Sequence, residues 1–269
     1  MKYAISNIAF PPAAGASAFS RVAAMGFEGL EVAPSRAWQN TWAGLTHRDV
    51  AKYRKEIESG GLSPVGLHSL LFDQPHLALC ESEESRSKLL DFFVHLSGVC
   101  RDLGGRTLIW GGGRRRGDNP EDHAISIAVE FFGHLADRIS DHGTVFCIEP
   151  LSHSDTDFLP LLEDCRAMVE HVDLPCLKIQ IDAKALAAND ELTMESFESV
   201  SGNLVHFHAN EPGFEVLGST GTVAHETAGR CLRHIGYTGF VSIEQKLTKP
   251  EDVFGPIDAS LQVLKRAYR

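Results

Sequence analysis

Four stretches of the chain share one pattern: VFCIEP at residues 145–150, LKIQIDAK at 177–184, LVHFHANEP at 204–212 and FVSIEQK at 240–246. Each is a short apolar run, rich in β-branched and aromatic residues, which predicts a buried strand. Each run also ends near a side chain that can bind a metal ion, namely Glu149, Asp182, His208 and Glu244. Ionisable groups are costly at the edge of a core unless they pair, bind metal or perform chemistry. Four of them in the same relative position therefore predict an active site.

The same kind of run recurs along the whole chain. The expected strands begin near Tyr3, Gly29, Pro64, Thr107, Val145, Leu177, Leu204 and Gly239. Successive starts lie 26 to 43 residues apart, which leaves room for a helix and two connections in each interval. Helical patterns occupy these intervals at 17–25, 46–59, 81–103, from Asn119-Pro120 onward, and at 157–171, 193–200, 222–235 and 250–266. Eight strands alternating with eight helices predict one domain over residues 1–269, a single (β/α)8 TIM barrel.

A doubly wound open sheet is the main structural alternative. Such a sheet usually carries a glycine-rich dinucleotide-binding turn after its first strand. The corresponding stretch here, SNIAFPPAAGAS at residues 6–17, does not contain the GxGxxG pattern. The eightfold alternation therefore favours the barrel.

Composition and charge narrow the functional classes. The 25 Lys and Arg against 36 Asp and Glu give a net charge of −11, which disfavours a protein that grips nucleic acid by bulk attraction. The six cysteines are scattered without zinc-site spacing, as in a protein with reduced thiols. The first residues, MKYAISNIAF, lack a signal-peptide core, and no apolar run approaches the ~20 residues of a membrane helix. We expect a cytoplasmic protein without a membrane partner, and a homo-oligomer is compatible with the sequence.

The chain resembles the xylose isomerase-like family of sugar isomerases and epimerases, which also includes the endonuclease IV group. The resemblance extends through AISNIAF (4–10), GFEGLEV (26–32), HFHANEP (206–212) and GYTGFVSIE (236–244). It implies that one divalent ion is held by Glu149, Asp182, His208 and Glu244. This donor set suits Mn²⁺ first, with Mg²⁺, Co²⁺ or Zn²⁺ as alternatives.

The resemblance also implies a reaction. It predicts a metal-dependent isomerase or epimerase of a sugar, sugar phosphate or keto-sugar, in which Glu149 and Glu244 transfer a proton by way of an ion-stabilised enediolate. The expected substrate is a small carbohydrate or keto acid. A metal-dependent dehydratase or lyase of the 3-dehydroshikimate dehydratase kind begins with the same proton abstraction and stays open as an alternative. An endonuclease IV-like nuclease and a non-catalytic barrel are weaker alternatives.

One segment departs from the family pattern. The family often has a histidine three residues after the aspartate ligand, whereas this chain reads Asp182-Ala183-Lys184-Ala185. The departure argues against the nuclease branch, which needs additional metal ligands. Lys184 could supply a positive charge to the substrate instead, or be a solvated loop lysine.

Several further residues near strand ends are candidates for substrate binding. They are His68, Trp110, Lys184, Glu211 and Glu31. Glu31 could orient His68 or touch a sugar hydroxyl, and Trp110 could stack on a sugar ring. The run from Gly111 to Arg116, GGGRRR, suits an anionic substrate such as a sugar phosphate or sugar acid, or is a solvated loop.

Overall fold

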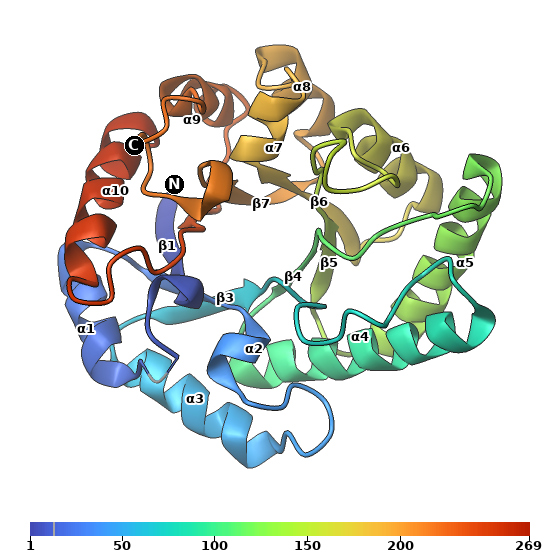
Figure 1. Cartoon of the computed structure of the whole chain (residues 1–269), viewed down its shortest axis with the longest axis horizontal. Coiled ribbons are helices and arrows are strands. Elements are labelled where there is room, and N and C mark those ends of the chain that lie inside the picture. Colours follow the sequence, from blue (N-terminus) through green and yellow to red (C-terminus); the bar gives the residue numbers. More distant parts are fainter. Residues whose placement is uncertain (13) are drawn as a thin grey trace.

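The computed structural model describes residues 1–12 and 14–269 and contains a closed barrel of parallel strands (Figure 1). The strands follow the chain order around the barrel, and β8 closes it by pairing with β1. Their bounds are β1 Lys2–Ser6, β2 Gly29–Val32, β3 Ser63–Leu67, β4 Thr107–Trp110, β5 Val145–Ile148, β6 Leu177–Asp182, β7 Leu204–Ala209 and β8 Phe240–Ile243. Every strand begins within one residue of its predicted start, and the predicted (β/α)8 barrel is confirmed.

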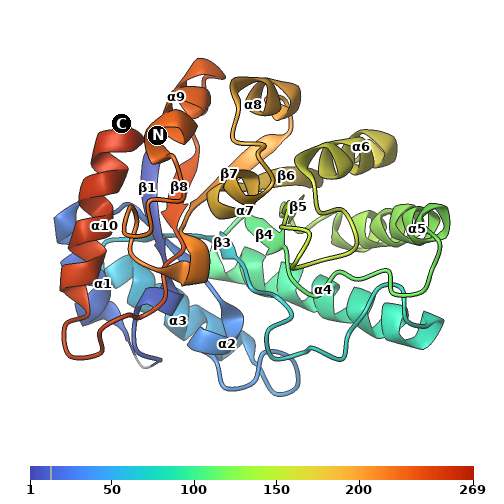
Figure 2. The ribbon, with the colours of Figure 1, turned by 45° about the horizontal axis from the view of Figure 1, so that its top comes forward.

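Helices form a ring around the strands (Figures 1 and 2). They are α1 Ala16–Met25, α2 Pro34–Ala37, α3 His47–Ser59, α4 Glu83–Leu103, α5 Glu121–Ile139, α6 Leu162–Val172, α7 Ala183–Ala188, α8 Met194–Val200, α9 His225–His234 and α10 Phe254–Ala267. Two 3₁₀ turns, η1 Asn7–Ala9 and η2 Pro212–Phe214, follow β1 and β7. Within the described ranges, none of these helices combines the length and apolar character needed to cross a bilayer.

Two features of the helical layer differ from the sequence prediction. The short helices α2 and α7, each directly after a strand, were not predicted. The helix predicted over 157–171 begins only at Leu162, because the preceding residues form a loop in which Leu159 has a positive φ of 54°. The Asp164 side chain then accepts a hydrogen bond from Leu161 N at 3.0 Å and stabilises the start of α6.

Side chains along each strand point alternately toward the helices and toward the inside of the barrel, and the two regions differ in polarity. In β7, Phe207 packs outward against Phe197 and Tyr268, whereas His206 and His208 are buried and face Glu31. The large core therefore lies between the sheet and the helices. The inside of the barrel carries polar side chains toward the end where the strands finish, and this end holds the candidate site.

Candidate active site

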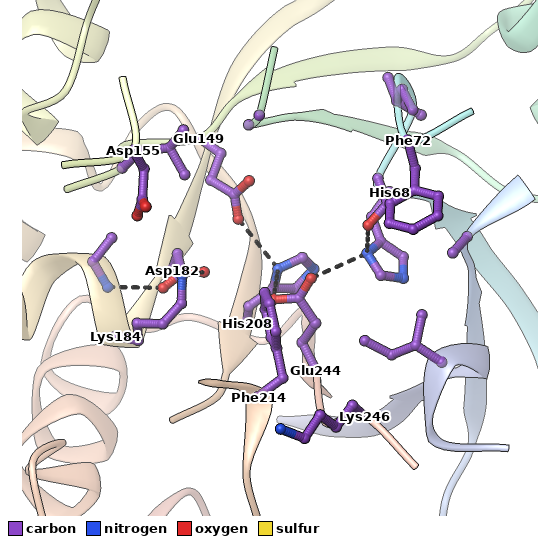
Figure 3. Close-up of a pocket in the computed structure, with 18 of the residues that line it drawn as sticks. His68, Phe72, Glu149, Asp155, Asp182, Lys184, His208, Phe214, Glu244 and Lys246 are labelled. Carbon is purple, nitrogen blue, oxygen red and sulfur yellow. Dashed lines mark hydrogen bonds and ion pairs between the residues drawn. The ribbon is translucent and has the colours of Figure 1, made fainter. Parts of the chain in front are cut away.

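The four predicted ligand side chains converge at one end of the barrel (Figure 3). Asp182 and His208 are paired neighbours in β6 and β7, and Glu244 N donates to Ala209 O at 3.1 Å. Glu149 follows β5 directly. One potential ligand atom from each of the four residues lies within 4.8 Å of the others. The structure thus brings together the whole set that the sequence indicated.

His208 links this group to a deeper carboxylate. Its Nε2 lies 3.0 Å from Glu31 Oε2, while its Nδ1 lies 3.3 Å from Glu149 Oε1 and 3.5 Å from Glu244 Oε2. Nδ1 is buried and has no hydrogen-bond partner among the described residues. An imidazole that donates from Nε2 to Glu31 presents the Nδ1 lone pair to the two carboxylates, an arrangement that a cation would satisfy. The donor set therefore fits a divalent metal ion.

The charges around His208 give the two glutamates different proton affinities. Burial raises the pKa of the Glu149 carboxyl, and the negative charges of Asp182 and Glu244 act in the same direction. Burial also opposes ionisation of Glu244, but His208 and His68 outweigh it and hold the Glu244 pKa well below its usual range. Pairs of carboxyl groups with separated pKa values are typical of acid–base catalysis.

Several neutral side chains hold the acidic group in place. Asn210 donates from Nδ2 to Asp182 Oδ2 at 2.7 Å and to Glu244 Oε2 at 2.9 Å. His68 lies with Nδ1 3.2 Å from Glu244 Oε1 and with Nε2 2.6 Å from Ser6 Oγ. The role of Asn210 was not predicted, because a bridge between the Asp182 and Glu244 carboxylates depends on the register of β6, β7 and β8.

Glu149 occupies space that a neighbouring glycine leaves free. A Cβ atom on Gly111 would lie only 1.7 Å from Glu149 Oε2. From the other side, the guanidinium of Arg114 donates to Glu149 O at 2.6 Å and to Leu159 O at 3.2 Å. The backbone and the carboxylate of Glu149 are thus both positioned by the loop after β4.

The arginines of this loop do not form an anion site. Arg114 is buried and bonds to backbone carbonyls, while Arg115 donates to Asp155 O at 3.2 Å and Arg116 to Asp157 O at 3.2 Å. Among the described residues that line the cavity, Gly111, Gly112 and Gly113 are present but these three arginines are not. The interpretation of the GGGRRR run as a phosphate- or carboxylate-binding loop is therefore corrected: its arginines hold the segment after β5.

The four side chains lie at the base of a cavity of about 1230 Å³. Two of the predicted substrate-binding residues, His68 and Lys184, line it. Lys184 Nζ lies 3.7 Å from Asp182 Oδ2 and 5.1 Å from the centre of the Phe214 ring. The negative charge of Asp182 raises the pKa of Lys184, so its ammonium group stays charged beside the cavity.

Trp110 lies elsewhere. Its ring packs against Phe93 at 5.1 Å and against Phe132 at 5.8 Å between centroids, in the layer between the sheet and the helices. Successive residues of a strand face opposite sides of the sheet, so Trp110 points outward to the helices while the next residue, Gly111, lines the cavity. The expectation that Trp110 stacks on a sugar is corrected by this alternation, which was readable from the sequence.

Glu31 and Glu211 are both fully buried and lie outside the described cavity lining. Glu31 contacts His206 and His208, so it orients these two imidazoles and not that of His68. Glu211 accepts hydrogen bonds from Gly218 N at 2.7 Å and from Thr220, and pairs with His225 Nε2 at 3.0 Å. Glu211 therefore fastens the loop after β7, and its expected contact with substrate is corrected.

Comparison with known proteins identifies the family of the chain. The family model described as xylose isomerase-like TIM barrel matches residues 19–267. The chain belongs to this family. It is 26% identical, over 230 residues, to D-psicose 3-epimerase of Agrobacterium fabrum (strain C58), covering 83% of this chain and 76% of that protein.

Solved structures with low sequence identity to this chain share its fold. D-psicose 3-epimerase from Clostridium cellulolyticum H10, solved with D-tagatose, has a TM-score of 0.83 at 16% identity, with 100% of both chains covered. The 3-keto-D-glucoside 4-epimerase from E. coli also has a TM-score of 0.83, at 20% identity, with 99% of both chains covered.

Proposed function

We propose that the protein is a divalent-metal-dependent epimerase of a small ketose or keto-sugar. The observation that carries the proposal is the placement of Glu149 and Glu244 on either side of His208, within one group of potential metal ligands. The named relatives, a D-psicose 3-epimerase and a 3-keto-D-glucoside 4-epimerase, favour epimerisation over the dehydratase and nuclease alternatives.

Glu149, Asp182, His208 and Glu244 would hold the ion, for which we expect Mn²⁺ before Mg²⁺, Co²⁺ or Zn²⁺. When bound by these residues, a divalent ion would supply Lewis-acid stabilisation of negative charge on substrate oxygen. Asn210 and Glu31 keep the ligands oriented, since each bonds to ligand side chains and lies outside the cavity lining described.

The two glutamates then move the proton. One carboxylate removes the proton from the carbon beside the carbonyl, which leaves an enediolate, and the carboxylic acid of the other residue returns a proton to the opposite face. His68 holds the Glu244 carboxylate at 3.2 Å, and Ser6 holds His68. Lys184 presents its positive charge to the same cavity, where it can stabilise negative charge that develops on substrate oxygen.

The test is exchange of the reacting proton in D₂O. The protein, loaded with Mn²⁺, is incubated with D-psicose, D-fructose and D-tagatose, and the products are followed by proton NMR. We expect interconversion of epimers with one deuterium gained, loss of activity with a chelator and recovery with Mn²⁺. Both Glu149→Gln and Glu244→Gln should lower turnover by roughly 10²–10⁴-fold while leaving the circular dichroism spectrum unchanged.

Two outcomes would contradict the proposal. Activity within a factor of two of wild type in both glutamine variants would exclude the two-carboxylate mechanism. An ultraviolet-absorbing unsaturated product from dehydroshikimate, without exchange into any ketose, would establish the lyase instead.

A further inference from the structure

The cavity has two chemically different sides (Figure 3). Asp155, Lys184 and the ligand group form a charged side, whereas the opposite side carries Phe72 next to His68. The segment after β3 supplies five lining residues that lack a side-chain hydrogen-bonding group: Leu70, Leu71, Phe72, Pro75 and Leu77.

Phe72 is unusual for its exposure. The residue is 77% exposed, and among residues 1–12 and 14–269 the other exposed large hydrophobic residue is Met194 on α8, at 37%. A single exposed hydrophobic residue on an open surface needs no explanation, but Phe72 lines the cavity, where its ring can contact an apolar group of a ligand.

The segment that carries Phe72 is held in place. Leu70, Leu71 and Leu77 are buried in the core, and Leu71 packs so closely on Gly113 that a Cβ there would approach it to 2.8 Å. Phe72 N donates to Ser69 O at 3.2 Å, and Thr41 donates to Asp73 Oδ2 at 2.6 Å. The Phe72 ring is therefore presented to the cavity by an anchored turn.

A free ketose bound over Glu149 and Glu244 would leave this apolar side unoccupied. Sugar hydroxyl groups placed there would lose water without gaining side-chain partners on the five lining residues Leu70, Leu71, Phe72, Pro75 and Leu77, which is unfavourable. The cavity volume of about 1230 Å³ also exceeds the roughly 300–1,000 Å³ of sites for drug-sized ligands. There is room for a sugar over Glu149 and Glu244 together with a second, apolar group.

We propose that the substrate is a keto-sugar carrying an apolar substituent, such as an aryl or alkyl glycoside, with the substituent against Leu70, Phe72 and Pro75. The proposal rests on the proposed function and adds the class of substrate. The chemistry is unchanged: a proton leaves the carbon beside the carbonyl and returns, and the glycosidic bond stays intact. Apolar area buried against residues 70–77 supplies binding free energy.

The experiment compares two glycosides of the same 3-keto-β-D-glucose, one methyl and one phenyl, by deuterium exchange in D₂O with the Mn²⁺-loaded protein. We expect kcat/KM to be at least ~10-fold higher for the phenyl glycoside, the factor given by burying about two methylene groups. Phe72→Ser should lower this ratio at least about threefold, whereas the matched control Met194→Ser, on the exposed face of α8, should leave it unchanged.

Exchange on the methyl glycoside and on free ketoses with a phenyl-to-methyl ratio below two would overturn this proposal alone. So would a Phe72→Ser variant that keeps the ratio but converts a dimer to a monomer in light scattering, because a second copy would then cover this side. Absence of exchange with every keto-sugar would overturn the proposed function and this proposal with it.

Discussion

The two halves of the barrel meet at one cavity but use their strand ends differently. Each of the strands β5 to β8 ends on or next to a side chain that could bind a divalent ion. Strands β2 to β4 contribute support: Glu31 behind His208, His68 beside Glu244, and Gly111 beside Glu149. Strands β5 to β8 are distinguished by the type of residue at their ends. Strands β2 to β4 are distinguished by how closely their residues pack against those ends.

The largest effect from the supporting half is expected at Gly111. In Gly111→Ala the new methyl group would occupy the place of the Glu149 carboxylate, whose Oε2 lies 1.7 Å from the Cβ position. A displacement of about 1 Å at a reacting group can cost roughly 100-fold. We expect kcat/KM to fall by about that factor and Mn²⁺ affinity to fall with it, measured by calorimetry.

Gly112→Ala is the matched control, because its Cβ position has no described atom within 4 Å and its φ is not positive. If Gly111→Ala kept the Mn²⁺ affinity of Gly112→Ala, the close fit between the two halves would have no functional role.

The next effect concerns the contact between Glu31 and His208. Burial opposes ionisation of Glu31, but His206 and His208 outweigh it and hold the pKa of this carboxyl well below its usual range. Glu31→Gln removes the charged acceptor that fixes the imidazole, and we expect Mn²⁺ affinity to fall by tens of times, within the ~10–100-fold range for such partners. Nitrogen NMR of His208 should show a changed tautomer population. Glu28→Gln, at an exposed residue just before β2, is the control and should bind Mn²⁺ as wild type does.

The two halves of the barrel differ in how much of their role could be predicted from the sequence, and the reason is physical. The convergence of Glu149, Asp182, His208 and Glu244 could be predicted, because side chains at the carboxyl ends of neighbouring barrel strands meet at one face of the barrel. Trp110 could have been placed correctly from strand alternation. The contacts of Glu211 and Arg114 could not be predicted. The partners of Glu211 lie in the loop and helix that follow it, and Arg114 donates to carbonyl groups 35 and 45 residues away. Long-range hydrogen bonds of this kind leave no periodic signal.

A smaller effect is expected at Lys184, which stands where the chain departs from its family. Lys184→Met keeps the length of the side chain and removes the charge beside Asp182 and Phe214. We expect kcat/KM to fall about tenfold, the cost of losing one hydrogen bond to a charged group. Mn²⁺ affinity should not fall, since a repelling cation is removed. Lys178→Met, in the preceding strand β6 and bonded to Asn203, serves as the control. If Mn²⁺ affinity fell in Lys184→Met, the role of this lysine would be to position Asp182 and not to contact the substrate.

The smallest effect is expected at Arg115, where the sequence and the structure point in opposite directions. If the arginine run bound a phosphate or carboxylate of the substrate, Arg115→Ala would lower kcat/KM for the anionic substrate at least tenfold relative to its neutral analogue. In the structure Arg115 is outside the described cavity lining and reaches Asp155 O at 3.2 Å, an exposed contact whose loss costs little. We therefore expect kcat/KM for the free and the phosphorylated form of one ketose to stay within twofold of wild type. A selective loss for the phosphorylated form would return this loop to the substrate site, and it would make the support half of the barrel a recognition surface as well.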